Sequence, residues 1–263
     1  MGLTNYLGRY DAVASRDISL AAVRRALEQG INYFDTAPGY GKGLSEEIMG
    51  EALEGGTDIV LATKVPLAAA DDVRESLEGS LRRLRRQKLD LLQIHGNSID
   101  GNLLRRMLAS GGTVAQLVRL REEGMVTAIG FTSEDNNRGV YELMDTGAFD
   151  TVQIAYNVLL QHPYEPTRPF GSLFEAKRHN LFTISMRTFT SGIFQKWIRL
   201  ANPDDRFDYT PALIQFVLSN PLIDVALVGM RTPEEVDANV AIWRDELGRI
   251  DVTQLWTRYV EAQ

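Results

Sequence analysis

Short runs of strand-type residues alternate with amphipathic helical stretches along the chain, and no other feature of the sequence limits the fold so strongly. The runs are rich in Ile, Val, Leu and Phe, which is typical of strands that are buried on both faces. Regular alternation of strands and helices predicts a parallel sheet. The expected strands lie at residues 31–34, 58–65, 89–95, 126–132, 150–157, 181–187 and 224–230, and the expected helices at 17–29, 45–54, 71–86, 113–123, 137–146, 170–179, 210–219 and 232–246.

An eight-stranded barrel is the architecture that this alternation favours. A short first strand in GLTNY (residues 2–6) would bring the number of strands to eight, and the 263 residues suit a barrel of about 250. An open doubly wound sheet is the alternative, but no GxGxxG turn follows the first strands. No linker or shift in composition divides the chain. We therefore expect an α/β fold, a (β/α)8 TIM barrel with parallel strands, forming a single domain over residues 1–263.

Charge and cysteine content exclude several classes of function. The net charge of −7 argues against nucleic acid or an anionic membrane as the main partner. No apolar run approaches the length of a membrane span, and the N-terminal residues lack the pattern of a signal peptide. With no cysteine there is neither a disulfide framework nor thiolate chemistry, which fits a reducing cytoplasm.

A basic cluster departs locally from the acidic balance of the chain. It could bind an anion, but leucines recur at helical spacing beside it, and a solvated helix face is the favoured interpretation. The cluster comprises Arg82, Arg83, Arg85, Arg86 and Lys88.

Ionisable and polar residues stand where the apolar runs stop. In barrels of this type the active site lies at the carboxyl ends of the strands, so these positions predict acid–base chemistry there. A metal site is not expected, because His95, His162 and His179 are far apart in the sequence and no HExxH-like spacing occurs. The strand-end residues are Asp35, Lys64, His95, Thr132, Ser133, Gln153, Met186, Arg187 and Gly229 to Arg231.

Three segments of the sequence resemble motifs of the aldo/keto reductase family. GINYFDTAPGYGKGLSEEIMGEAL is similar to the family signature, in which an Asp ends the second strand and a Tyr follows five residues later. These residues are Asp35 and Tyr40, while ATKV places Lys64, and LLQIHG places His95, at the family's lysine and histidine positions. Each residue alone has an ordinary structural explanation, such as a turn cap or a core histidine. All four in order, at similar separations, indicate a catalytic tetrad.

The resemblance implies an NAD(P)H-dependent reductase of an aldehyde or ketone, reversibly an alcohol dehydrogenase, that works by direct hydride transfer. Tyr40 would be the general acid, although a tyrosine hydroxyl normally titrates near pH 10. The ammonium of Lys64 would stabilise the phenolate and lower that pKa. Asp35 would hold Lys64 in place, and His95 would hydrogen-bond the carbonyl oxygen.

The segments IGFTSE, VQIAYN and VALVGMRTPEEVDANV resemble the cofactor-contacting motifs of the family. Thr132, Ser133 and Gln153 would hydrogen-bond the nicotinamide carboxamide, and Met186 stands where many relatives have an aromatic residue stacked on the nicotinamide. The cofactor-binding residues that the resemblance implies are Thr132, Ser133, Gln153, Met186, Arg187, Thr190, Ser191, Gly192, Gly229, Arg231, Glu235 and Asn239.

The start of the last major helix is expected to hold the adenosine phosphate. Thr232 and Pro233 are typical N-cap and N1 residues, and free backbone N–H groups there attract anions. Arg231 would pair with a 2′-phosphate. Glu235 would either repel that phosphate or turn back to the backbone as a capping-box residue. NADPH is therefore the expected cofactor, with NADH possible.

The largest departure from the family pattern is expected at the N-terminus. The chain begins inside the first strand, so we expect a shortened N-terminus without the usual β-hairpin. Two connections are long enough to be functional, residues 96–112 and residues 188–209. The second carries Phe189, Trp197, Phe207 and Tyr209, and would form either a substrate lid or a packed surface loop. The expected partner is a small carbonyl substrate, with the protein a monomer or weak homo-oligomer. The alternatives are a cofactor-binding regulatory subunit of the same fold, and a barrel lyase or isomerase.

Overall fold

Seven parallel strands form one sheet in the computed structural model, which describes residues 15–66, 72–96, 98–99 and 101–261. The order of the strands in the sheet follows their order in the sequence, from β1 to β7. The strands are β1 (Tyr33–Asp35), β2 (Val60–Pro66), β3 (Leu89–His95), β4 (Val126–Ser133), β5 (Thr151–Ala155), β6 (Phe182–Met186) and β7 (Val225–Ala226). The helices are α1 (Arg16–Glu28), α2 (Leu44–Ala52), α3 (Val73–Leu84), α4 (Gly101–Leu108), α5 (Thr113–Glu122), α6 (Arg138–Asp145), α7 (Ser172–Arg178), α8 (Ile193–Ala201), α9 (Thr210–Leu218), α10 (Pro233–Arg244) and α11 (Val252–Glu261).

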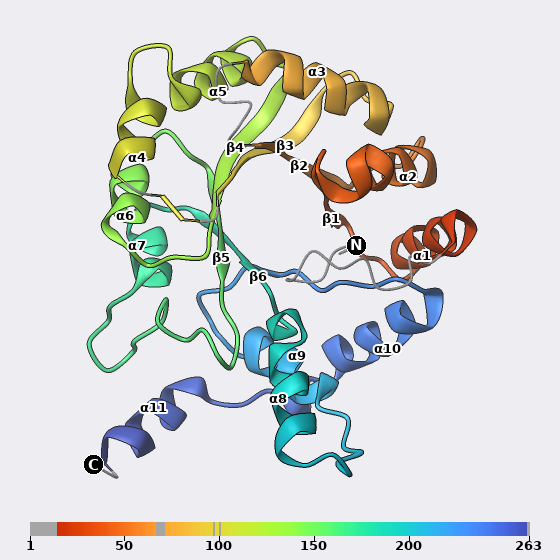
Figure 1. Cartoon of the computed structure of the whole chain (residues 1–263), viewed down its shortest axis with the longest axis vertical. Helices are drawn as coiled ribbons and strands as arrows, with labels where there is room; N and C mark the ends of the chain where they lie inside the picture. Colours follow the sequence, from red (N-terminus) through yellow and green to blue (C-terminus); the bar gives the residue numbers. More distant parts are fainter. Residues whose placement is uncertain (1–14, 67–71, 97, 100, 262–263) are drawn as a thin grey trace.

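The sheet is curled, with helices along its outer side, as in a TIM barrel (Figure 1). The helices lie in an arc around the strands, in the order α1, α2, α3, α5, α4, α6 and α7, and α9 and α10 continue it. A doubly wound sheet would reverse its strand order at a switch point, and this sheet does not reverse. The alternative of an open doubly wound fold is therefore wrong. The expected first strand and the shortened N-terminus lie outside the described residues.

The two faces of each strand carry different side chains. Leu61 and Val65 of β2 belong to the large core between the sheet and the helices, whereas Ala62, between them, belongs to a small apolar cluster with Leu91 and Ile184 inside the curl. Because side chains alternate along a strand, Lys64 shares the inner face with Ala62. The inner face is apolar at its middle and polar where the strands end.

Three sequence expectations need correction, and one helix was not expected. The expected strand at 224–230 pairs only over Val225–Ala226, because the backbone leaves the sheet after Leu227 donates to Ser185. The expected connection 96–112 contains α4, whose Leu104 and Met107 are buried three residues apart. The connection 188–209 contains α8, and α11 was not expected. Among the described residues, none of these helices combines the length and apolar character needed to cross a bilayer.

Helices α2 and α3 approach each other most closely at Gly50. A Cβ at this position would lie 2.4 Å from the carbonyl oxygen of Arg83 and 2.7 Å from the carbonyl carbon of Leu84. Backbone cannot yield as a flexible side chain can, so only glycine lets the two helices meet here. Gly79 in α3 offers a contrast, because its Cβ would first meet the end of the Arg83 side chain at 3.4 Å.

We predict that Gly50→Ala lowers the free energy of unfolding by about 1–3 kcal/mol, the usual cost of overpacking. Gly79→Ala is the matched control, and we expect it to be neutral or to stabilise the helix by up to about 1 kcal/mol. Urea unfolding of the wild type and both variants measures the difference. Equal stability of the two variants would contradict the close approach of α2 and α3.

Candidate active site

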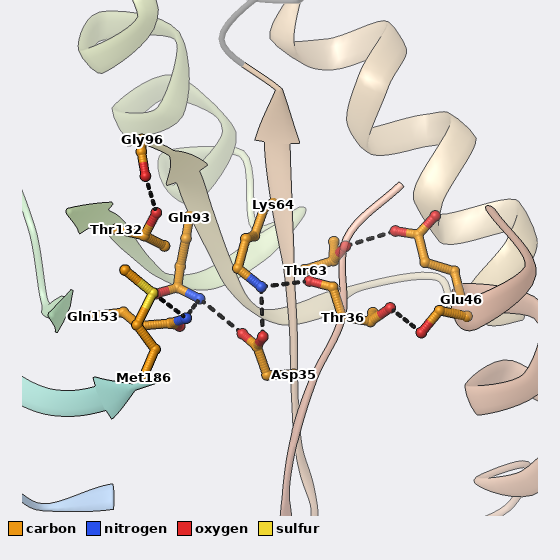
Figure 2. Close-up of polar contacts among 11 residues, drawn as sticks. Asp35, Thr36, Glu46, Thr63, Lys64, Gln93, Gly96, Thr132, Gln153 and Met186 are labelled. Carbon is orange, nitrogen blue, oxygen red and sulfur yellow. Dashed lines mark hydrogen bonds and ion pairs between the residues drawn. The ribbon is translucent and has the colours of Figure 1, made fainter. Parts of the chain in front are cut away.

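Lys64 lies near the end of β2, and its side chain is only 1% exposed. Its Nζ donates to Asp35 Oδ1 at 2.5 Å and to the carbonyl oxygen of Thr36 at 2.7 Å (Figure 2). Asp35 ends the neighbouring strand β1, so parallel pairing of β1 with β2 brings the two charges together. A buried ammonium is costly unless it is paired and hydrogen-bonded. The carboxylate and the carbonyl therefore hold one positive charge at a defined point.

Tyr40 and His95 lie beside this ion pair. Tyr40 begins the 3-10 helix η1 (Tyr40–Gly43), and the centroid of its ring is 5.2 Å from Lys64 Nζ. The ring meets the His95 imidazole edge to face, with centroids 5.7 Å apart and planes at 84°. Behind Tyr40 the chain turns through Gly41 (φ 60°) and Gly43 (φ 96°), conformations that glycine adopts most readily. The structure thus brings the four predicted tetrad side chains into one cluster.

Burial and charge act in opposite directions on the two rings. Burial raises the pKa of Tyr40 above its ordinary value, and the nearby Lys64 ammonium only partly offsets this. The expectation that Lys64 lowers this pKa is right for the direction of its own effect and wrong for the net result. Burial and, secondly, the charge of Lys64 lower the pKa of His95 to about 4. At neutral pH the cluster therefore holds a protonated phenol and a neutral imidazole.

Gln93 is a site residue that the sequence analysis did not identify. It is fully buried on β3, and its Nε2 donates to Asp35 Oδ2 at 3.3 Å and to Gln153 Oε1 at 3.1 Å. The Gln153 amide nitrogen lies 3.6 Å from Met186 Sδ. Gln93 stands two residues before His95, so strand alternation places both on the inner face. That spacing was the available signal, but a glutamine inside an apolar run has no chemistry of its own to draw attention.

Glu46 of α2 connects that helix to the strand ends. Its carboxylate is fully buried, accepts from Thr63 Oγ1 at 2.6 Å, and is paired with Arg83 Nε at 2.6 Å. The preceding residue, Ser45, accepts a hydrogen bond from Thr36 Oγ1 at 2.9 Å. Thr36 and Thr63 are the chain neighbours of Asp35 and Lys64, so α2 holds both halves of the ion pair in position (Figure 2).

The sequence suggested that the basic cluster at the end of α3 is a solvated helix face, but several of its arginines make contacts within the chain. Besides the Arg83 pair, Arg85 donates to Glu54 at 2.8 Å and Arg86 donates to the carbonyl oxygen of Leu53 at 2.7 Å. These contacts all run to α2 or to the residues just after it. The arginines therefore attach α3 to α2, and the sequence could not show this because it depends on how the helices pack.

The predicted carboxamide contacts are at the ends of β4 and β5. Thr132 Oγ1 donates to the carbonyl oxygen of Gly96 at 2.8 Å. Ser133 Oγ accepts from the Asp135 backbone N–H at 3.0 Å, so both hydroxyls already have partners within the chain. The amide nitrogen of Gln153 has a thioether as its neighbour, which is a weak acceptor. Gln153 is thus the best placed of the three to donate to a ligand.

The turn after β6 contains four predicted cofactor contacts. Arg187, Thr190, Ser191 and Gly192 have φ values of 61°, 54°, 53° and 80°. Arg187 Nη1 donates to Ser191 Oγ at 2.7 Å, and the guanidinium also pairs with Glu134. Left-handed backbone at non-glycine residues is strained and is common in ligand-binding turns.

The start of α10 contains the predicted adenosine-end residues. Thr232 caps the helix, its hydroxyl accepting from the Glu235 backbone N–H. Glu235 turns back, accepting from the Arg231 backbone N–H at 2.6 Å and from its guanidinium at 2.9 Å. The geometry thus matches a Glu that turns back to the backbone, and it also shows this Glu paired with Arg231. Gly229 precedes this turn, and the half-buried Asn239 lies one helical turn beyond Glu235.

His179 lies among the outer helices, away from the cluster. His179 Nε2 is 3.2 Å from Asp145 Oδ1 and 3.1 Å from Glu175 Oε1, at the ends of α6 and α7. Three ligand-type atoms thus meet at this surface, a grouping that the sequence spacing did not indicate. Glu175 is also paired with Arg178, so the grouping is accounted for as an ion-pair network.

Comparison with known proteins gives one consistent family. A model of the aldo/keto reductase family matches residues 1–213. The uncharacterised oxidoreductase YqkF of Bacillus subtilis (strain 168) is 31% identical over 271 residues, covering 89% of this chain and 85% of that protein. The NADH-specific methylglyoxal reductase of Escherichia coli (strain K12) is 29% identical over 166 residues, covering 55% of this chain and 49% of that protein. The crystal structure of an aldo/keto reductase from Klebsiella pneumoniae in complex with NADP and acetate is similar in fold, with a TM-score of 0.68, 26% identity, and coverage of 91% of this chain and 83% of that one.

The electrostatics predict that one imidazole remains neutral well below neutral pH. The proton NMR signals of the three histidines should include one that titrates near pH 4, and it should be absent from His95→Gln. Because an unfolded histidine has a pKa of about 6.5, the unfolded chain binds this proton first, and stability is lost as the pH falls from about 6.5 to about 4. A His95 midpoint near 6.5 would contradict the burial of the ring beside Lys64.

Proposed function

Because the chain belongs to the aldo/keto reductase family, we propose that it reduces an aldehyde or ketone with NADPH, and that the Tyr40 hydroxyl is the proton donor. The family consists of NAD(P)-dependent oxidoreductases, and the chain is one of them. The observation that carries the proposal is the buried Lys64 ammonium between Asp35 and the Tyr40 ring. No observation favours a regulatory subunit, a lyase or an isomerase over this chemistry.

The proposed mechanism assigns one role to each side chain of the cluster. The reduced nicotinamide, when bound, supplies the hydride that adds to the carbonyl carbon. Tyr40 stays protonated at neutral pH because burial raises its pKa, so it holds a proton for the developing alkoxide. Lys64 stabilises the phenolate that remains, and Asp35 keeps the ammonium in place. The neutral imidazole of His95 donates a hydrogen bond that orients the carbonyl oxygen.

The residues that would hold the cofactor fit a dinucleotide. The Gln153 amide nitrogen, with only a thioether within reach in the described part of the chain, suits a carboxamide oxygen. In the strained turn at 190–192 the backbone N–H groups of Thr190 and Gly192 donate within the chain, so the Ser191 hydroxyl is the group that would contact a pyrophosphate. The capped start of α10 carries a positive dipole end, and Arg231 lies beside it for a 2′-phosphate. These residues lie on β5, in the turn after β6 and in the turn after β7.

The central test is Tyr40→Phe. We expect this variant to bind NADPH nearly as the wild type does and to lose roughly 100- to 10,000-fold in kcat, as expected for removal of a general acid. Absorbance at 340 nm with a panel of aldehydes and ketones measures turnover, and quenching of protein fluorescence measures cofactor binding.

Tyr33→Phe is the matched control for this test. Tyr33 lies on β1, two residues before Asp35, and its buried hydroxyl has no hydrogen-bond partner among the described residues. Removal of this hydroxyl should leave both turnover and stability close to those of the wild type. Undiminished turnover of Tyr40→Phe would remove the proposed acid.

Cofactor choice depends on Arg231 and its competition with Glu235. We predict that Arg231→Ala weakens NADPH binding by about tenfold and NADH binding much less, because only NADPH carries the 2′-phosphate. Glu235→Gln keeps an acceptor for the Arg231 N–H but removes the competing charge, so it should tighten NADPH. Fluorescence titration of the wild type and both variants with each cofactor measures the six affinities. An equal loss for NADPH and NADH in Arg231→Ala would show that Arg231 does not recognise the phosphate.

A further inference from the structure

Gln93 lies between the proton-donating cluster around Lys64 and the proposed nicotinamide contact Gln153. On one side its Nε2 contacts Asp35 Oδ2 at 3.3 Å, the carboxylate oxygen that Lys64 does not use. On the other side the same nitrogen contacts Gln153 Oε1 at 3.1 Å. An unbroken series of hydrogen bonds therefore runs from the Lys64 ammonium to the Gln153 amide, across β1, β2, β3 and β5 (Figure 2).

The orientation of the Gln93 amide follows from its neighbours. Both groups that face its nitrogen are acceptors, a carboxylate oxygen and an amide oxygen, and the NH2 group has two hydrogens to give. The reversed amide would set oxygen against the Asp35 carboxylate, which is repulsive. Gln93 therefore acts as a donor on both sides.

This orientation determines what Gln153 can offer. Because its Oε1 is occupied by Gln93, its free end is the NH2 group, which donates. The NH2 group has the Met186 sulfur at 3.6 Å as its contact, a weak partner that a carboxamide oxygen can replace. Gln153 would thus recognise an acceptor on the ligand, and Gln93 sets the orientation of the Gln153 amide.

We propose that Gln93 is a positioning residue that fixes the Gln153 NH2 group toward the nicotinamide carboxamide and, at the same time, holds the Asp35 carboxylate against Lys64. The inference rests on the proposed function, since it needs a nicotinamide beside Gln153. Gln93 itself touches neither the substrate nor the cofactor in this account. Its contribution is the coupling of cofactor binding to the geometry of the proton-donating cluster.

A space-filling role does not explain this residue. Gln93 is fully buried, and its Oε1 has no hydrogen-bond partner in the part of the chain that the structure describes. A buried amide oxygen without a partner is costly, and an apolar side chain of the same length would avoid that cost. The amide is therefore explained by its two donated hydrogen bonds.

The test is a double-mutant cycle on NADPH affinity with Gln93→Met, Gln153→Met and the double variant. Methionine keeps the length of glutamine and removes the hydrogen bonds. We expect each single variant to weaken NADPH about five- to twentyfold by fluorescence titration, and the double variant to bind no more weakly than Gln153→Met alone. The Gln93→Met variant should also lose kcat at pH 7, because Asp35 loses a partner.

Two further variants separate positioning from stability. Gln215→Met is the matched control, because Gln215 is also buried and hydrogen-bonded, but to the end of α10 and the residues after it. It should lower the melting temperature without changing NADPH affinity. Gln93→Glu places a carboxylate beside Asp35, and as the pH falls this group gains a proton to donate. At low pH the NADPH affinity of Gln93→Glu should therefore approach that of the wild type. At the same pH it should exceed the affinity of Gln93→Met.

Several outcomes would overturn the inference. Unchanged NADPH affinity in Gln93→Met, or losses that multiply in the double variant, would show that Gln93 does not act through Gln153. If Gln93→Met does not fold, the test is the Gln93→Glu variant. A ratio of its NADPH affinity to that of the wild type that does not change with pH would also show that Gln93 does not act through Gln153. A wild-type protein that binds no NADPH would contradict the proposed function as well, whereas a binding wild type with an unaffected Gln93→Met contradicts the inference alone.

Discussion

The buried charge of Lys64 is the constraint on which the rest of the site depends. An ammonium inside a protein is tolerated only where nearby oxygens replace its water, and here these are Asp35 Oδ1 and the Thr36 carbonyl. Asp35 ends β1 and Thr36 follows it, so the position of the charge depends on the parallel pairing of β1 with β2. The same positive charge lowers the pKa of His95 and opposes the effect of burial on the pKa of Tyr40. Strand pairing and acid–base chemistry are therefore set by one interaction.

The surroundings of this pair explain why the strand ends stay in register. Ser45 and Glu46 of α2 bind the residues that follow Asp35 and precede Lys64, and Arg83 of α3 neutralises the buried carboxylate of Glu46. The close approach of α2 and α3 at Gly50 permits that contact. The outer helices thus do more than cover apolar strands. They determine the positions of the groups that carry out the proposed chemistry on the inner face.

Much of this arrangement could be predicted from the sequence. The strands and their parallel order follow from apolar runs, and the four side chains of the proposed tetrad follow from residues that match a family motif. Gln93 and Glu46 could not be predicted, because their roles depend on contacts between elements rather than on spacing within one. The pairing of Arg83 with Glu46 depends on how α2 and α3 pack. The pKa of Tyr40 depends on how deeply its ring is buried. The strand at 224–230 was predicted too long and helix α8 was missed, because apolar composition alone does not determine where pairing stops or where an exposed helix begins.

Transfer of deuterium tests the central claim most directly. NADPH that carries deuterium at both hydrogen positions of nicotinamide C4, with an aldehyde or ketone in ordinary water, should give an alcohol with one deuterium on the former carbonyl carbon. The hydroxyl hydrogen should come from water through the protein. Mass spectrometry of the product distinguishes the two positions. An alcohol with only ordinary hydrogen on that carbon, or no alcohol from any carbonyl compound, would contradict direct hydride transfer at this site.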